Sequence, residues 1–406
     1  MRVYLDHQST TPMLPGVQEA MGPFLRARFG NPSALHAEGI AARDAISRAR
    51  QQVSEFLGAE SSDEIIFTGN GTEAVNLAIK GAAFANQRRG KHIVLSAAEH
   101  PATNKSVGWL ESMGFTASIV PVDNEGRASP EAVQAALTPE TILVCLHHAN
   151  HDLGTIQDIQ RIGAMTSERG ALLFVDAIAS AGWLPLNVQQ LRVDLVALSP
   201  HRFYGPKGVG VLYRHRRARL QSLIHGGEQE EGRRAGTEHV PAIVGAGAAA
   251  EIAQKEFRGR VEHTSLLQRK TVAALFKKIE FIKLNGPPPG AHRHPAHLNL
   301  SVEFVDGEGL GLMLDVRGIA VGTSTACVAK NLRVPAALAA IGLSESLAKG
   351  TVLISFGQEN SEAEVDYLAE TLAKCVTTLR EMSPGWDDFR RGLIKSEIAS
   401  AIRADS

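Results

Sequence analysis

The sequence predicts an α/β protein. We expect a large domain with a mainly parallel, seven-stranded type of sheet flanked by helices, and a smaller α+β domain after it. Short, almost continuously apolar runs alternate with longer stretches of helical periodicity, as in a parallel sheet covered on both faces. Glycine supplies 38 of the 406 residues, which suits many tight turns between strands and helices. A chain of this length is expected to form two domains, since a domain usually takes about 100–200 residues.

The larger domain is predicted over residues 14–255. A strand at Glu64–Phe67 leads through a glycine-rich turn into a helix, and another helix is expected at Ile159–Arg169. Because strands separated by helices pair in parallel, these elements predict one covered sheet. Further apolar runs of strand length lie at Lys91–Ser96, Thr141–Leu146, Ala171–Val175, Val193–Leu198 and Gly208–Tyr213.

The smaller domain is predicted over residues 256–406, joined by residues 1–13. A long helix is expected at Val261–Ile279, followed by a loop rich in proline and glycine. The remaining elements are a strand at Leu298–Phe304, a helix near Gly307–Val316, strands near Ile319–Gly322 and Val352–Phe356, and a closing helix at Glu362–Leu379.

Composition excludes several classes of protein. The 42 Lys and Arg residues balance 43 Asp and Glu, for a net charge of −1, and no polybasic run is present, so a nucleic-acid partner is not expected. No stretch of 18 apolar residues predicts a membrane span, and the first residues contain no apolar signal segment. Three cysteines cannot build a disulfide framework, so we expect a cytoplasmic protein.

A glycine-rich turn, Thr68-Gly-Asn-Gly-Thr72, lies between a predicted strand and a helix start. Backbone N–H groups at a helix amino end attract anions, and Thr72 adds a hydroxyl, so the turn is a candidate phosphate site. An ordinary turn with a helix cap is the alternative. Asp176 ends an apolar strand, where a carboxylate faces the ligand crevice of an open sheet. A helix cap or a surface carboxylate is the alternative there.

Polar groups are densest from Ser199 to Gly208, where a hydroxyl, an imidazole, a guanidinium and an ammonium share one turn. This density indicates an anion site. His100 follows another predicted strand, with a structural role as the alternative. His147, His148 and His151 are clustered, but no cysteine or carboxylate set completes a zinc spacing, so no metal site is expected.

Cys327 lies among small polar residues, which suits a reactive and accessible thiol. A free cysteine without function is the alternative. The other two cysteines lie within apolar patterns and are expected in the core.

Taken together, these segments resemble the cysteine desulfurases, which have the class V aminotransferase fold. The resemblance covers nearly the whole chain. It rests on segments at Tyr4–Pro12, Gly30–Ser33, Gly71–Ala74, Glu99-His100, the stretch from Asn150, Val175–Ala177, Ser199–Gly208, Gly226-Gly227, Arg234–Thr237 and Thr325–Cys327. Together with the tail MSPGWDDF, these motifs are specific to that family.

The resemblance implies a homodimer that binds pyridoxal 5′-phosphate (PLP). Thr72, Ser199 and His201 match phosphate contacts, and Thr237 matches a phosphate contact supplied across the dimer. His100 matches the imidazole that stacks on the pyridine ring, and Asp176 matches the carboxylate that pairs with the ring nitrogen. Cys327 matches the loop cysteine that attacks the substrate sulfur and carries a persulfide. Asn150 and His151 fall at substrate-binding positions.

The sequence departs from this family where the chemistry occurs. Arg202 stands at the position of the Schiff-base lysine, and a guanidinium has no free nucleophilic amine. Lys207 is not an obvious substitute, because the family has Gly-Pro-Lys-Gly beside its true lysine. Ala179 replaces a glutamine that contacts PLP, His151 an asparagine, and Leu353 an arginine that binds the substrate carboxylate. PLP is therefore expected to bind only non-covalently, if at all, with another phosphate or anion as the alternative.

Three functions follow from these residues. The first is a degenerate desulfurase-like protein, a pseudoenzyme in sulfur transfer or iron–sulfur cluster assembly. It would act through Cys327 as a scaffold, sulfur relay or regulator, with an iron–sulfur scaffold or sulfur acceptor as partner. The second is a PLP enzyme, a cysteine desulfurase or an altered lyase or transferase, with the cofactor held non-covalently. The third is a PLP-free enzyme that uses the anion turn, His100 and His201 on another phosphorylated ligand.

Overall fold

A sheet of seven strands forms the centre of the structure. The computed structural model describes residues 2–323 and 334–404. In it the sheet comprises β2 (Ile65–Thr68), β3 (His92–Ser96), β4 (Thr116–Val120), β5 (Thr141–His147), β6 (Leu172–Asp176), β7 (Leu195–Leu198) and β8 (Gly210–Arg214). The strand order is β2-β8-β7-β6-β5-β3-β4. Only β8 in this sheet runs against its neighbours, so the predicted mainly parallel sheet is confirmed.

All strands of this sheet except β4 lie within two residues of the apolar runs that predicted them. β4 is an edge strand that pairs only with β3. Of its five residues, only Val120 is buried. An edge strand that is largely open to solvent has no continuous apolar run, and the sequence pattern therefore did not reveal it.

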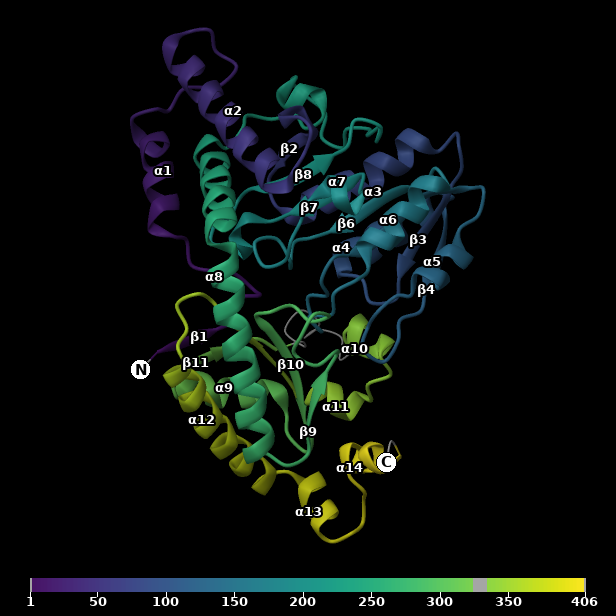
Figure 1. The fold of residues 1–406 in the computed structure, drawn as a ribbon, viewed down its shortest axis with the longest axis vertical. Coiled ribbons are helices and arrows are strands. Elements are labelled where there is room, and N and C mark those ends of the chain that lie inside the picture. Colours follow the sequence, from purple (N-terminus) through teal and green to yellow (C-terminus); the bar gives the residue numbers. More distant parts are fainter. Residues whose placement is uncertain (1, 324–333, 405–406) are drawn as a thin grey trace.

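Helices cover both faces of the sheet (Figure 1). One face packs against α1 (Pro15–Arg26), α2 (Ala37–Leu57), α5 (Pro130–Ala136), α6 (Ile159–Glu168), α7 (Val188–Leu191) and the first half of α8 (Val240–Lys278). The other face packs against α3 (Gly71–Asn86) and α4 (Pro101–Ser112). Short 3₁₀ turns occur at η1 (Ser62–Glu64), η2 (Pro200–Arg202) and η3 (Gln229–Gly232).

Two smaller sheets lie beyond the large one. Strands β9 (Ile282–Asn285), β10 (His297–Val302) and β12 (Thr351–Ser355) form an antiparallel sheet in the order β12-β10-β9. Strand β1 (Val3–Leu5) pairs in parallel with β11 (Ile319–Val321), which brings the first residues of the chain into this part. The accompanying helices are α9 (Gly307–Val316), α10 (Ala336–Ala340), α11 (Glu345–Lys349), α12 (Glu362–Glu381), α13 (Pro384–Arg390) and α14 (Glu397–Ala404).

The helix α8 connects the two parts of the molecule. It is continuous over 39 residues and crosses residue 255, where the sequence pattern changes. It packs on α1 and α2 beside the large sheet and on α12 beside the small ones (Figure 1). In the part of the chain that the structure describes, no helix is long and apolar enough to cross a bilayer.

Candidate functional site

A cavity of about 170 Å³ lies at the carboxyl ends of the parallel strands. Its walls come from the turn before α3, the start of α4, the loops after β5 and β6, and η2. The structure brings seven predicted site residues together here: Thr72, His100, His151, Asp176, Ser199, His201 and Arg202. Strand ends that are far apart in the sequence meet at one edge of a parallel sheet, which explains this convergence.

One end of the cavity is the amino end of α3. Asn70 caps this helix, because its side-chain oxygen accepts a hydrogen bond from the backbone N–H of Glu73 at 2.9 Å. A side chain on Gly71 would collide with Ile178 and Ser199, at 2.7 and 3.0 Å from its Cβ position. The glycine therefore keeps the helix end close to the 199–202 turn. The exposed N–H groups and helix dipole favour an anion at this place.

Asp176 ends β6 and is buried in the cavity wall. Its Oδ1 accepts a hydrogen bond from the N–H of Ile178 at 3.0 Å. Burial raises the pKa of Asp176, and the neighbouring His100 acts against that rise. A carboxylate placed so deeply gains from a cationic or N–H partner in the cavity.

His100 is fixed by its position at the start of α4. Its Nδ1 accepts a hydrogen bond from the N–H of Ala102 at 3.0 Å, so the Nε2 holds the proton of the neutral ring. The ring meets His151 edge-on, with centroids 4.7 Å apart. Burial lowers the pKa of His100 to about 4, and that of His151 to about 3, so both rings are neutral near pH 7.

Arg202 lies between this cavity and a second one of about 300 Å³, which also contains Asp6, Gln8 and Leu353. The carbonyl of Arg202 accepts a hydrogen bond from Trp183 Nε1 at 3.1 Å, and its Nη1 lies 3.4 Å from Gln8 Oε1. Lys207 is exposed and lines neither cavity. Among the described residues that line the two cavities, none is a lysine.

A buried polar network supports the part of the cavity wall that contains His147. Glu99 Oε1 accepts hydrogen bonds from Ser96 Oγ at 2.6 Å and from His147 Nδ1 at 2.8 Å. His147 Nε2 lies 2.9 Å from Gln157 Nε2, which donates to it. This set fixes the tautomer of His147, a residue that lines the cavity. His148 instead bonds Ser180, so the adjacent histidines have separate surroundings.

Two predicted site residues lie outside the cavity wall, and a third falls outside the described residues. Asn150 is fully buried and holds the 150–154 turn. Its amide donates to the carbonyl of Ala98 and its oxygen accepts from the N–H groups of Asp152 and Leu153. Thr237 is exposed and is absent from the residues that line the cavity. Cys327 lies outside the described residues.

Comparison with known proteins decides the family. The aminotransferase class-V model matches residues 3–368. The chain belongs to the aminotransferase class-V family.

Within this class-V family, the chain is similar to proteins named as cysteine desulfurases. It is 41% identical over 382 residues to the cysteine desulfurase IscS of Dictyoglomus turgidum, covering 94% of this chain and 96% of that protein. It is 40% identical over 390 residues to the cysteine desulfurase IscS of Clostridium botulinum, covering 96% and 98%. The solved structure of a NifS-like protein superposes with a TM-score of 0.87 at 34% identity, covering 93% of this chain and 100% of that one. The predicted class V fold is thus confirmed.

Two polar residues beside the cavity, Gln8 and Glu99, were given no role in the sequence analysis. Gln8 contacts Arg202 across 194 positions of the chain, and Glu99 reaches His147 across 48. Both lie in motifs that carried the family resemblance, but no local spacing predicts their partners. Only the fold brings these segments together.

Proposed function

We propose that this protein is a divergent cysteine desulfurase-type protein that binds PLP without a covalent bond and acts in sulfur transfer. The feature that supports it most is Arg202, which lines both cavities and stands at the position that the family resemblance assigns to the Schiff-base lysine. A guanidinium stays protonated at any physiological pH and provides no nucleophilic amine. No lysine among the described lining residues replaces it.

The remaining polar groups fit PLP. Thr72, Ser199 and His201 surround the amino end of α3, where a phosphate would be held. Asp176 is a buried carboxylate in the same cavity, suited to the pyridine nitrogen, and His100 offers a neutral ring face. PLP, when bound, supplies an electron sink for an amine substrate.

Three further differences from the family reduce ordinary desulfuration. Ala179 lines the cavity without a hydrogen-bonding side chain, and Leu353 lines the adjoining cavity without a charge. His151 supplies a neutral ring where the family has an amide. Removal of a buried charge-assisted hydrogen bond commonly costs about 2–5 kcal/mol, so these changes weaken both cofactor and substrate binding.

The proposed activity lies in Cys327 as a sulfur relay. Its thiolate would attack the outer sulfur of a partner's persulfide, which transfers that sulfur and releases the partner's thiolate. The protein would work as a cytoplasmic homodimer with a sulfur-acceptor or iron–sulfur scaffold protein as its partner. In the dimer, Thr237 would complete the phosphate site of the other subunit.

The test is trapping of bound PLP with borohydride, followed by peptide mass spectrometry. We expect the wild-type protein to bind PLP that gel filtration removes and to give no reduced PLP–lysine product. Arg202→Lys should give that product at position 202, and a Lys207→Ala variant of wild type should behave as wild type does. A PLP–lysine product in the wild-type protein, at Lys207 or elsewhere, would overturn the proposal.

A second test concerns the relay. A partner protein loaded with a labelled persulfide should transfer the label to the wild-type protein but not to Cys327→Ala. Cys145→Ala serves as the control, because Cys145 is fully buried in β5 and should not take part. Equal labelling of the wild type and Cys327→Ala would show that this thiol has no relay role.

A further inference from the structure

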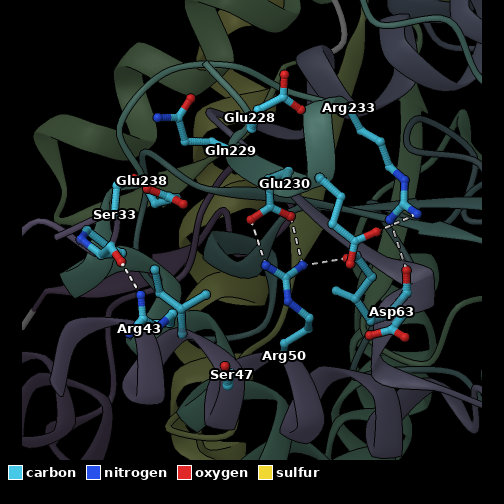
Figure 2. Close-up of a pocket in the computed structure, with 14 residues that line it drawn as sticks. Ser33, Arg43, Ser47, Arg50, Asp63, Glu228, Gln229, Glu230, Arg233 and Glu238 are labelled. Atoms are coloured by element: carbon cyan, nitrogen blue, oxygen red, sulfur yellow. Dashed lines mark hydrogen bonds and ion pairs between the residues drawn. The ribbon is translucent and has the colours of Figure 1, made fainter. Parts of the chain in front are cut away.

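The loop that carries Arg234 and Thr237 is anchored to the large sheet by Glu230. This buried carboxylate accepts two hydrogen bonds from Arg50 of α2, each 2.7 Å long, and one from the N–H of Phe67 at 3.0 Å. Figure 2 shows Glu230 of η3 meeting Arg50 of α2. The anchor holds Glu230 and Glu231 in left-handed backbone conformations, with φ of 50° and 57°. The course of the next residues is thereby set.

Four residues further along, this loop reaches the amino end of α3. Arg234 Nε donates to Glu73 Oε1 at 2.8 Å. The other carboxylate oxygen of Glu73 accepts the N–H of Gly69 at 2.8 Å, which closes the turn before the helix. The Cβ position of Gly69 lies 2.7 Å from Glu73 Oε2 and 3.4 Å from Arg234 Nη2, so the three groups are packed together. Glu73 and Arg234 also line a hollow behind Asn70 and Thr72.

The negative charge of Glu73 opposes the binding of an anion at the amino end of α3. Its carboxylate shapes the turn, but its negative charge lies in the first turn of the helix whose amino end would receive a phosphate. An unpaired carboxylate there repels a phosphate dianion, and a guanidinium bonded to it removes most of that repulsion. Both side chains are about three-quarters buried, which limits screening by salt.

We propose that Arg234 is a positioning residue for phosphate binding: it neutralises Glu73 and holds the 68–72 turn in the shape that admits the anion. This inference rests on the proposed function, because it assumes that the amino end of α3 binds the phosphate of PLP. It adds a residue that lines the hollow behind the turn and acts on the phosphate only through Glu73. Loss of Arg234 should therefore matter for phosphorylated ligands and little for others.

The experiment measures the affinity of the full-length protein for PLP and for pyridoxal, which lacks the phosphate. The variants are Arg234→Met, Glu73→Gln and the double variant. In Glu73→Gln the amide keeps an oxygen that can accept the Gly69 N–H, so the turn survives while the charge is lost. Thermal unfolding of each variant without ligand shows whether it is folded.

We expect Arg234→Met to weaken PLP binding about tenfold, as one unpaired charge beside a helix-terminal anion site would, and to leave pyridoxal binding within about twofold. Glu73→Gln should bind PLP at least as tightly as wild type. The double variant should recover most of the loss. Raised salt should change the difference between Arg234→Met and wild type only slightly, because the side chains of Glu73 and Arg234 are about three-quarters buried.

The outcomes separate the two proposals. If the wild type binds PLP no more tightly than pyridoxal, the phosphate site itself is absent, and both the proposed function and this inference fail. If the wild type prefers PLP but Arg234→Met weakens both ligands equally, or the double variant is as weak as Arg234→Met, only the inference fails. If Arg234 had a purely structural role, its loss would weaken PLP and pyridoxal binding equally, and the double variant would not recover.

Discussion

The ion pair between Arg50 and Glu230 gives a prediction with a definite magnitude. The Glu230 side chain is 2% exposed and that of Arg50 19%. Arg50→Met leaves the Glu230 carboxylate buried and, among the described residues, with the N–H of Phe67 as its one remaining donor. Removing one partner of a buried pair costs about 3–5 kcal/mol, since the remaining charge is desolvated without compensation. We therefore expect Arg50→Met to lower the free energy of unfolding by about 4 kcal/mol.

Denaturant unfolding followed by tryptophan fluorescence measures this change. Hydrogen exchange of residues 228–232 should also rise, because the left-handed backbone at Glu230 loses the bonds that hold it. The double variant Arg50→Met/Glu230→Leu should recover much of the loss, as apolar replacement of a buried pair often does.

A matched control lies in the same loop. Arg233 pairs with Glu231 at 2.7 Å, but the Glu231 side chain is 62% exposed. Arg233→Met should lower the free energy of unfolding by no more than about 1 kcal/mol. If Arg50→Met costs as little as Arg233→Met, burial does not govern the strength of these pairs and the reasoning is wrong.

Two more predictions concern the site and its surroundings. Burial lowers the pKa of His148 from 6.5 to about 4. Between pH 6.5 and 4 the unfolded chain therefore binds more protons at this ring than the folded protein does. The contribution of His148 to the free energy of unfolding should fall as the pH drops from 6.5 to 4 and stay constant below pH 4. Asp152, with its pKa raised to about 6, acts in the opposite direction between pH 3.8 and 6, whereas the lowered pKa values of His100 and His151 act in the same direction as that of His148. His148→Asn should therefore make the fall in stability between pH 6.5 and 4 shallower by the share of this one ring, measured by unfolding at each pH. Gly210→Ala should destabilise the protein and weaken PLP binding, because its Cβ would lie 2.3 Å from the backbone of Asn70. Gly259→Ala, with open space at that position in α8, should instead stabilise by about 1 kcal/mol, and calorimetry of both variants checks the contrast.

The large sheet and much of the site were predictable from local patterns. Apolar runs of strand length predicted β5 and β6. The positions of Asp176 and the 199–202 turn directly after predicted strands indicated that both belong to the ligand crevice. The edge strand β4 was not predictable, because all of its side chains except Val120 are at least partly open to solvent. Gln8 and Glu99 were assigned no role, since their contacts depend on segments that only the fold brings together.

Asn150 shows the limit of transferring a motif. Its side chain is buried in the 150–154 turn. The amide nitrogen donates to one backbone carbonyl, and the amide oxygen accepts from two backbone N–H groups. A sequence pattern gives the residue type at such a position. It does not give the direction of the side chain.

The length of α8 limits how the molecule can move. A helix of 39 residues extends over about 58 Å at 1.5 Å per residue. Its one proline, Pro241, stands in the first turn, where it does not bend the helix. Because α8 packs against both the large sheet's helices and α12, a rotation of these two parts against each other would have to bend α8. A continuous helix resists such bending. We therefore expect the rate of ligand exchange at the cavity lined by Arg202 and Leu353 to respond to substitutions beside that cavity rather than to substitutions within α8.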